Sequence, residues 1–392
     1  MLPFLDLSSK DYSTRSAETR RAREASWCAK TPYGLAVLRH RECGQLLRDR
    51  RLRQGSFNWP RRHGMTGSFV SFWEASVIAA RHDTHKALRD IIVPVLSDSF
   101  VASFVPRFEA ISADLCAQLR SKDTCEFMEA FAIPFAGQAI AVLLGLERRD
   151  GVRISHDASD LGLAMGVSCK SHEARINAAC DRLTDLAREL VRDARRNSGG
   201  TGLIPQMVER FDQSSGLSET DLLNLIVITI FGGVDTTRSQ LGLGMALFIE
   251  NPAQWAAVRV DLTLVPNAVE EMIRQRPTTT WVTREAIESF EFHGKEIEKG
   301  TMIHLLVHAS ATDPLVGEAA SFDVSAKRKS HFGFGGGAHH CIGHLIARTD
   351  MAVALRSLCQ TLETVSYARE PTFLPDSGNT SPVSLPISYR LT

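Results

Sequence analysis

The 392-residue chain lacks an excess of charge of either sign, because 45 Lys and Arg side chains balance 45 Asp and Glu side chains. This balance argues against a basic arm for nucleic acid or a polybasic patch for a membrane surface. The sequence also lacks the roughly 20 consecutive apolar residues of a spanning helix and the apolar block of a signal peptide. We therefore expect a cytoplasmic protein that binds neither nucleic acid nor a membrane.

The eight cysteines lack the paired spacing of CxxC metal or redox motifs. In a chain of this length without a secretion signal, they are expected to be reduced thiols that pack as small buried hydrophobic residues. Cys341 is the exception because of its neighbours. A hydrophobic share of 44% with 23% charged residues excludes a disordered or collagen-like chain and permits a large core.

Most of the sequence has helical periodicity. Residues 99–120, 127–146 and 173–196 place apolar residues three and four positions apart, as helices that bury one face do. Short strand patterns occur at 34–38 and 302–307, and they predict a small amount of sheet.

A glycine turn within 290–298 predicts a hairpin there. No repeat of fixed period and no low-complexity linker divide the chain. We expect a mainly α fold with a minor β portion, formed as a single domain over residues 1–392. A short N-terminal segment, about 1–30, is expected to be less ordered.

The most informative stretch is 331–348, with the sequence HFGFGGGAHHCIGHLIAR. Glycines interrupt regular structure before Cys341, and a helical pattern begins directly after it. The start of a helix favours an anion, so the sulfur of Cys341 is predicted to ionise unusually easily. A thiolate at this position can ligate a metal.

Three interpretations of this stretch remain open from its residues. Cys341 could be a buried cysteine beside a glycine turn. A zinc site built from His339, His340, Cys341 and His344 has suitable residue types, although three adjacent positions cannot all point at one tetrahedral ion. The third interpretation is heme iron held by a single thiolate.

The segment FGGGAHHCIG resembles the heme loop of the cytochrome P450 family. The family's pattern is matched at Phe334, Gly337, His339, Cys341 and Gly343. The resemblance implies a cytochrome P450 fold, in which heme b lies between a long distal helix and a proximal Cys loop. It further implies Cys341 as the iron ligand, Phe334 as a shield of its sulfur, and Gly343 as the point where the next helix lies against the porphyrin.

A second motif lies within 222–249, an almost entirely apolar segment whose Asp and Arg favour a core helix over a membrane span. Gly232 and Gly233 leave room for a flat ligand or dioxygen. The Thr236 hydroxyl can bond back to the Gly232 carbonyl, which is expected to interrupt the helix by opening its backbone hydrogen-bond ladder there. By itself the motif fits better a helix whose polar groups are satisfied locally. Its order resembles the family's distal helix, which implies Asp235 as a proton relay and Thr236 as the hydroxyl that holds water and the distal oxygen.

Glu271 and Arg274 lie one helical turn apart and resemble the family's ExxR pair. The resemblance implies a buried structural pair behind the heme loop. The family's third partner is an arginine before that loop, but the corresponding place holds Ala326, with Lys327 and Arg328 adjacent. The third partner therefore stays open.

The resemblance also implies four contacts to the heme propionates. His85 and Arg89 match the family's pattern on one helix, and Arg284 and His339 match two further positions. The planar fork of arginine suits carboxylates. For any one of these residues, a solvated surface role is an equal alternative.

By resemblance, the substrate pocket is lined by residues 57–73, 230–237, 278–282 and 380–383. Aromatic rings in the first segment could stack an apolar or aromatic ligand, or they could be ordinary core. Threonines in the third segment suggest a substrate with some hydrogen-bonding groups. The residues expected at the pocket are Phe69, Phe72, Trp73, Val234, Thr279, Trp281, Pro382 and Val383.

The resemblance implies a heme-thiolate monooxygenase that inserts one oxygen atom from O₂ into a hydrophobic or aromatic small molecule in specialised metabolism. Electrons would come from NAD(P)H through a ferredoxin and a ferredoxin reductase, with Arg81, Lys86 and Lys329 as a basic docking face. Oxidative coupling or demethylation on the same scaffold stays open. So does a non-catalytic heme-thiolate binding or sensor protein, although the acid and alcohol on the distal helix favour catalysis.

Overall fold

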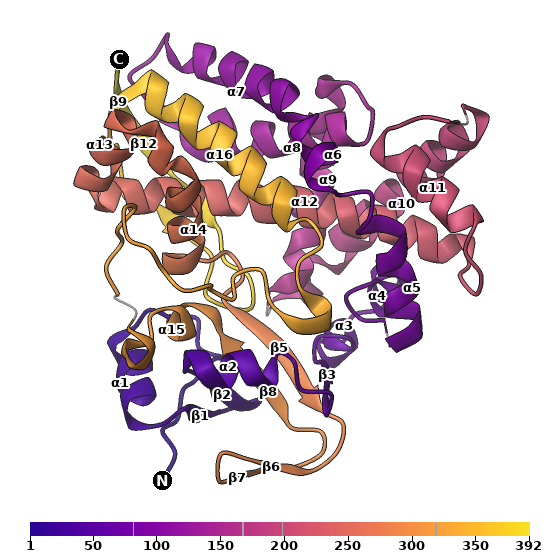
Figure 1. Cartoon of the computed structure of the whole chain (residues 1–392), viewed down its shortest axis with the longest axis vertical. Helices are drawn as coiled ribbons and strands as arrows, with labels where there is room; N and C mark the ends of the chain where they lie inside the picture. The colour runs from indigo at the N-terminus through magenta and orange to yellow at the C-terminus, as the bar shows by residue number, and fades with distance from the viewer. Residues whose placement is uncertain (81, 167, 198, 318–319) are drawn as a thin grey trace.

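Helices form most of the molecule, and a five-stranded sheet lies at the end that holds the N-terminus (Figure 1). The computed structural model describes residues 1–80, 82–166, 168–197, 199–317 and 320–392. The predicted mainly α fold with a minor β portion is confirmed. The described α-helices are α1 (Ala17–Ala25), α2 (His40–Leu46), α3 (Trp59–Arg62), α4 (Ser68–Ala75), α5 (His82–Ile92), α6 (Asp98–Ala102), α7 (Val105–Leu119), α8 (Ile133–Leu143), α9 (Gly151–Gly162), α10 (Glu173–Arg196), α11 (Leu203–Asp212), α12 (Glu219–Glu250), α13 (Pro252–Val260), α14 (Val265–Gln275), α15 (Val307–Ala311) and α16 (His344–Thr361).

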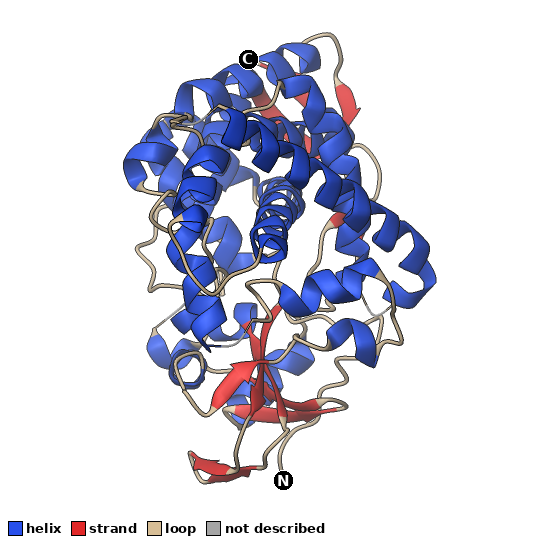
Figure 2. Ribbon diagram, turned by 90° about the vertical axis from the view of Figure 1, so that its right-hand side faces the viewer, coloured by secondary structure: helices blue, strands red, loops and turns tan. Residues whose placement is uncertain are grey.

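Helix α12 crosses the helical part of the molecule, and other helices surround it (Figures 1 and 2). It begins at a capping box, in which the side chains of Ser218 and Asp221 each accept from the backbone N–H of the other residue. It is long and apolar enough to cross a membrane, but 67% of its most apolar window is buried inside the protein. The predicted core helix is therefore present, and it runs unbroken through Gly232 and Gly233.

The two halves of α12 belong to different apolar clusters. Leu225 and Val234 pack in a cluster with side chains from α4, α5, α8, α9 and α10. Leu241 and Phe248 pack in a second cluster with side chains from α7, α13, α14 and α16. Burying a side chain of this size stabilises the fold by roughly 1.5–3 kcal/mol, so these clusters hold α12 firmly in place.

Two of the predicted helices are divided in the structure. The segment 99–120 forms α6 and α7, and the break precedes Pro106 in the first turn of α7. The segment 127–146 begins with a π-helical turn, Met128–Ala132, before α8 starts around Pro134. Proline has no N–H to donate, so it is tolerated in the first turn of a helix, and α7 and α8 each begin at such a proline.

The five-stranded sheet has the order β1-β2-β8-β5-β3. Strand β8 lies parallel to β2 and antiparallel to β5. The register of β5 and β8 pairs Thr283 with His304 and Arg284 with Ile303. Side chains alternate along a strand, so Thr283 and His304 share one face while Arg284 points to the other. The described strands are β1 (Cys28–Thr31), β2 (Gly34–Val37), β3 (Leu52–Gln54), β4 (Thr124–Glu126), β5 (Trp281–Ala286), β6 (Phe290–Phe292), β7 (Lys295–Ile297), β8 (Met302–Leu306), β9 (Leu362–Tyr367), β10 (Thr372–Phe373), β11 (Pro382–Ser384) and β12 (Pro386–Leu391).

The N-terminal segment, expected to be less ordered, packs against the rest of the protein. Leu5 and Leu7 are buried in an apolar cluster with strand residues of the five-stranded sheet. The backbone N–H and the hydroxyl of Thr14 donate to Asp376 Oδ2 at 2.8 and 2.9 Å. These bonds join the start of the chain to a loop near its end.

Candidate active site

A cavity of about 630 Å³ lies between α12, the glycine-rich loop before α16 and the five-stranded sheet. Its walls bring together segments that are more than a hundred residues apart in the sequence. Helix α12 and the glycine-rich loop contribute Gly232, Gly233, Thr236, Phe334, His339, Cys341 and Gly343 to the lining.

Cys341 sits just before α16, where the loop is held by backbone hydrogen bonds. Its N–H donates to the Phe334 carbonyl at 2.9 Å, and Arg89 Nη1 donates to the His340 carbonyl at 2.9 Å. Gly343 is the N-cap of α16, so Cys341 lies directly before the positive end of the helix dipole. The prediction that Cys341 lies where the glycine-rich loop becomes a helix is therefore confirmed.

The ionisation of Cys341 differs from the prediction. Burial raises the pKa of the Cys341 thiol, while the Gly343 amide and the charges of Arg89 and Arg348 act in the opposite direction. The expectation of an unusually acidic thiol is wrong for the thiol alone, because desolvation is the larger effect. A metal cation at the sulfur would reverse this balance, since a coordinating thiol is deprotonated outright.

Two glycines leave space on opposite walls of the cavity. A Cβ atom added at Gly232 on α12, or at Gly343 beside Cys341, would meet no atom within 4 Å. A Cβ atom at Gly233 would instead lie 3.1 Å from Ile140. The gap suits a flat group held between the helix and the thiolate loop, as the resemblance implies for heme.

Positive and imidazole side chains gather at the edge of this gap. Arg284 is 3% exposed and pairs with no carboxylate within the described part of the chain; burial lowers its pKa to about 10. The rings of His85 and His339 lie 4.2 Å apart. Burial, with further effects of His85, Arg284 and Arg89, lowers the pKa of His339 to about 3. An anionic ligand would compensate the buried charge of Arg284, and two heme propionates fit this set of donors.

Phe334 and Gly337 have different parts in the loop. Phe334 lines the cavity, and the Arg348 guanidinium lies 4.3 Å from its ring centroid. Gly337 does not line the cavity; its φ is +67° and an added Cβ would lie 2.3 Å from the Leu47 carbonyl oxygen. Gly337 therefore lets the loop approach the end of α2.

The zinc interpretation finds no support in the geometry. Within the described residues, no group of three His, Cys, Asp or Glu side chains is arranged to hold a metal ion. The rings of His340 and His344 pack 4.7 Å apart, and Arg348 contacts His344 Nδ1 at 2.8 Å. Cys341 stands alone as a metal ligand, which is the arrangement of a heme thiolate.

The side chains of Asp235 and Thr236 on α12 point in different directions. Thr236 lines the cavity, and its hydroxyl donates to the Gly232 carbonyl at 2.5 Å, which confirms the predicted bond. Asp235 is buried outside the described lining and pairs with Arg238. Its Oδ1 faces α9, where a Cβ added at Gly162 would lie 2.8 Å away. Only Thr236 of the pair therefore presents its polar atom to the cavity.

The expected pocket residues divide into lining and core. Trp73, Thr279 and Trp281 line the cavity. Phe69, Phe72 and Val234 are buried in an apolar cluster and are not among the lining residues, whereas Trp73 belongs to both. Their assignment to the pocket is corrected.

The expected C-terminal hairpin also lines the cavity at a different place. Pro382 packs against α12, where it would lie 2.8 Å from a Cβ added at Gly242, and Val383 is 60% exposed. The cavity is instead lined by Ser377, Gly378 and Asn379. A φ of +98° at Gly378 marks a turn, and the Ser-Gly-Asn composition is the sequence signal that could have located it.

The ExxR pair is buried and has a third partner. Arg274 Nε and Nη2 donate to the two carboxylate oxygens of Glu271 at 2.6 and 2.7 Å, and both side chains are 1% exposed. Arg328 Nη2 lies 3.5 Å from Glu271 Oε1. The question left open at Ala326 is thus answered two residues further along the chain.

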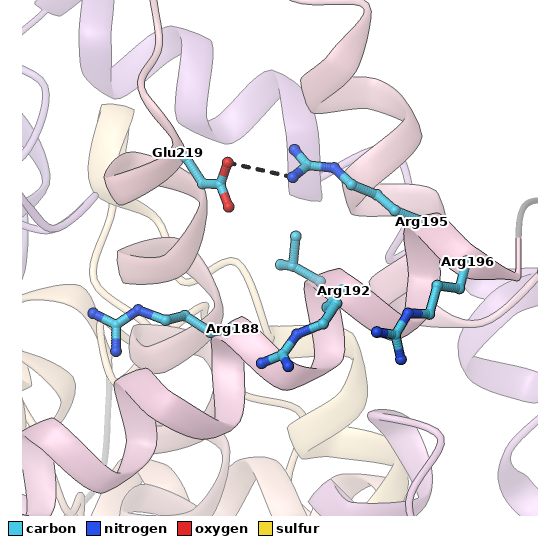
Figure 3. Close-up of a pocket in the computed structure, with 6 residues that line it drawn as sticks. Arg188, Arg192, Arg195, Arg196 and Glu219 are labelled. Carbon is cyan, nitrogen blue, oxygen red and sulfur yellow. Dashed lines mark hydrogen bonds and ion pairs between the residues drawn. The ribbon is translucent and has the colours of Figure 1, made fainter.

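A second hollow, of about 440 Å³, lies at the surface where α10 ends (Figure 3). Arg188, Arg192, Arg195 and Arg196 line it together with Glu219. Arg195 pairs with Asp212 at 3.2 Å and with Glu219 at 3.3 Å. These ion pairs join α10 to α11 and to the start of α12.

Comparison with known proteins agrees with this geometry. The family described as Cytochrome P450 matches residues 164–380, which is more than half of the chain. Luteothin monooxygenase of Streptomyces thioluteus is 30% identical over 99% of this chain and 96% of the relative. Nocardicin C N-oxygenase of Nocardia uniformis subsp. tsuyamanensis is 27% identical over 99% and 98%. The structure of cytochrome P450 CYP109Q5 from Chondromyces apiculatus shares the fold at a TM-score of 0.87, with 22% identity and full coverage of both chains. The chain belongs to the cytochrome P450 family.

Proposed function

We propose that this cytochrome P450 inserts one oxygen atom from O₂ into a hydrophobic small molecule of specialised metabolism. As a member of the family it is a heme-dependent oxidoreductase that receives electrons from redox partners. Relatives carry names of oxygen insertion into natural products, such as luteothin monooxygenase and 6-deoxyerythronolide B hydroxylase. The observation that carries the proposal is the half-buried Cys341 in the cavity wall, with an open gap between it and α12.

Residues around this gap account for heme binding. Cys341 would ligate the iron, and the Gly343 amide would moderate electron donation from the sulfur. Arg89 and Arg284 would pair with the propionates, and His85 and His339 would complete the same donor set. Heme held there supplies the activation of dioxygen.

Thr236 and Asp235 on α12 would assist proton transfer. The Thr236 hydroxyl holds its proton at the cavity wall, bonded to the Gly232 carbonyl. Asp235 would have to exchange its bond with Arg238 for one toward the cavity before it could pass a proton to that side. Assistance of this kind is commonly worth about 10²–10⁴ in rate.

The cavity walls support a mostly apolar substrate with some polar groups. Ile140, Leu143 and Ile228 provide aliphatic surface, and Trp73 and Trp281 provide aromatic surface. The polar part of the lining includes Thr278, Thr279, Ser377 and Asn379.

A cytoplasmic ferredoxin and its reductase, driven by NAD(P)H, would supply the electrons. Of the expected docking residues, Arg81 lies outside the described part of the chain. Lys86 pairs with Asp90, which compensates its charge. Binding of the ferredoxin to this basic face is therefore expected to depend on the surrounding charges as well as on Lys329.

The test of the proposed function is the carbon-monoxide difference spectrum of the reduced holoenzyme. Wild type and Cys125→Ser should show the band of thiolate-ligated heme, whereas Cys341→Ser should lose it. Cys125 is a suitable control because it is another thiol, in β4, away from the cavity lining. Survival of the band in Cys341→Ser would remove Cys341 as the ligand.

Turnover under labelled O₂ then tests the reaction. One labelled oxygen atom in the product is expected for insertion. A product without it would indicate coupling or another outcome instead.

A further inference from the structure

His304 on β8 carries a buried polar atom that no described residue satisfies. The ring lines the cavity and is only 5% exposed. Its Nδ1 atom has no hydrogen-bond partner in the part of the chain that the structure describes. A buried polar atom without a partner is unfavourable, so its retention beside a cavity points to a ligand.

The protonation of His304 decides what that ligand must offer. Burial lowers the pKa of His304 to about 4, and an interaction with the Leu35 backbone opposes this shift. A bond that raises the pKa of an imidazole favours its protonated form, so the ring donates to the Leu35 carbonyl. A neutral imidazole donates from one nitrogen and accepts at the other. Because Nδ1 has no partner among the described residues, Nε2 is the donor and Nδ1 is left as an acceptor.

Two aromatic rings pack against the His304 ring. The Trp281 ring lies edge-on to His304 at a centroid distance of 5.7 Å, and the Tyr33 ring lies at 5.9 Å. Both rings also line the cavity. A buried acceptor without a partner discriminates between a ligand group that can donate a hydrogen bond and one that cannot.

The register of the sheet places His304 and Arg284 on opposite faces. His304 shares a face with Thr283, whereas Arg284 points to the opposite face and reaches the Gly336 carbonyl in the loop. All three residues nevertheless line the same cavity. Thr236 on α12 and His304 on β8 both line this cavity, so a molecule that fills it can contact both residues.

We propose that His304 is a specificity-determining residue, whose Nδ1 accepts a hydrogen bond from a hydroxyl or N–H group of the substrate. This inference deepens the proposed function and rests on it, because the cavity must hold the heme and the substrate together. It assigns the substrate class: an apolar molecule that carries a hydrogen-bond donor.

The experiment uses the holoenzyme and anchored probes. N-alkylimidazoles coordinate heme iron through the imidazole and shift the Soret band, so their tails extend into the cavity. Two series of increasing chain length are compared, one ending in a hydroxyl and the other in the matching methyl ether. At the length that reaches His304, the alcohol should bind about three- to tenfold more tightly, as one added hydrogen bond predicts.

Variants connect this preference to His304. In His304→Phe the preference should fall to about one, because the acceptor is removed while the ring is kept. His304→Gln keeps an acceptor and should keep part of the preference. His156→Gln, at an exposed position of α9, should keep all of it.

An unchanged preference in His304→Phe would overturn the proposal. So would equal binding of the alcohol and the ether at every length in wild type, which tests the idea even if a variant fails to bind heme. Failure of the proposed function would appear separately, as a missing thiolate band in the wild-type spectrum.

Discussion

Arg328 Nη2 lies 3.5 Å from Glu271 Oε1 and so adds a second cation to the buried pair of Glu271 and Arg274. The two cations are not equivalent. Arg274 is 1% exposed and binds both carboxylate oxygens, whereas Arg328 is 16% exposed and also donates to the Ser321 carbonyl at 3.2 Å. Arg274 therefore compensates most of the Glu271 charge.

Replacing Arg274 should cost far more stability than replacing Arg328. Arg274→Met would leave Glu271 buried without its main partner and lower the free energy of unfolding by about 3–5 kcal/mol. Arg328→Met should lower it by about 1 kcal/mol, since its contact is longer and partly exposed. Urea unfolding of the two holoproteins measures the difference, and equal losses would contradict this ranking.

Gly335 and Gly337 form a matched pair for the heme loop. Both have φ of +67°, but a Cβ at Gly335 would lie 3.4 Å from the His339 carbonyl oxygen and one at Gly337 would lie 2.3 Å from that of Leu47. Gly335→Ala should cost about 1–2 kcal/mol from backbone strain. Gly337→Ala adds a steric clash, so we expect about 2–5 kcal/mol and loss of heme during purification. Heme content and unfolding of both variants test this; equal behaviour would argue against the close approach to α2.

Thr236→Ala should uncouple electron use from product formation. The hydroxyl at the cavity wall is removed while Gly232 and the heme loop stay in place, so product per electron should fall about tenfold or more. Thr184→Ala on α10 removes the same kind of bond, from Thr184 to the Cys180 carbonyl at 2.8 Å, outside the cavity lining. NADH consumption and product are measured together, and unchanged coupling in Thr236→Ala would exclude the assigned role.

Glu270 links α14 to the heme loop and to α16 through hydrogen bonds with His331 and Arg348. Burial by itself raises the pKa of Glu270, but these two partners outweigh it and hold the pKa at about 2. Because the folded-state pKa lies below the unfolded value of 4.5, the stabilisation is present above pH 4.5 and is lost as pH falls toward 2. We expect a loss of about 1 kcal/mol after allowance for solvent screening.

The measurement for Glu270 is the free energy of unfolding between pH 5 and 3. Glu270→Gln should flatten this part of the profile relative to wild type. Glu363→Gln removes an exposed pair with Arg390 and should leave the profile unchanged. A wild-type slope in Glu270→Gln would assign the acid sensitivity to other groups.

Local patterns were sufficient to predict the central parts of the site. The glycines around Cys341, the threonine four residues after Gly232, and the i, i+3 spacing of Glu271 and Arg274 each determine their own geometry. These features depend on neighbours within one turn or one loop, which the sequence displays directly.

Features set by packing between distant elements could not be predicted. The direction of Asp235 depends on the approach of Gly162 and on Arg238. Phe69 and Trp73 stack on the same face of α4, yet of the two only Trp73 lines the cavity, which depends on the elements packed around α4. His304 lies in a short apolar run, and its role becomes visible only when β5 and β8 are placed side by side.

The bonds of Thr14 to Asp376 carry a practical consequence for anyone who prepares this enzyme. Asp376 directly precedes Ser377, Gly378 and Asn379, which line the cavity, so Thr14 holds one end of a cavity-lining segment in place. Removing the first residues of the chain, or fusing a bulky affinity tag to them, would alter ligand binding in the cavity while the heme content stays normal. If a preparation has full heme content but no activity, the N-terminal residues of the expressed protein should therefore be checked before the catalytic residues.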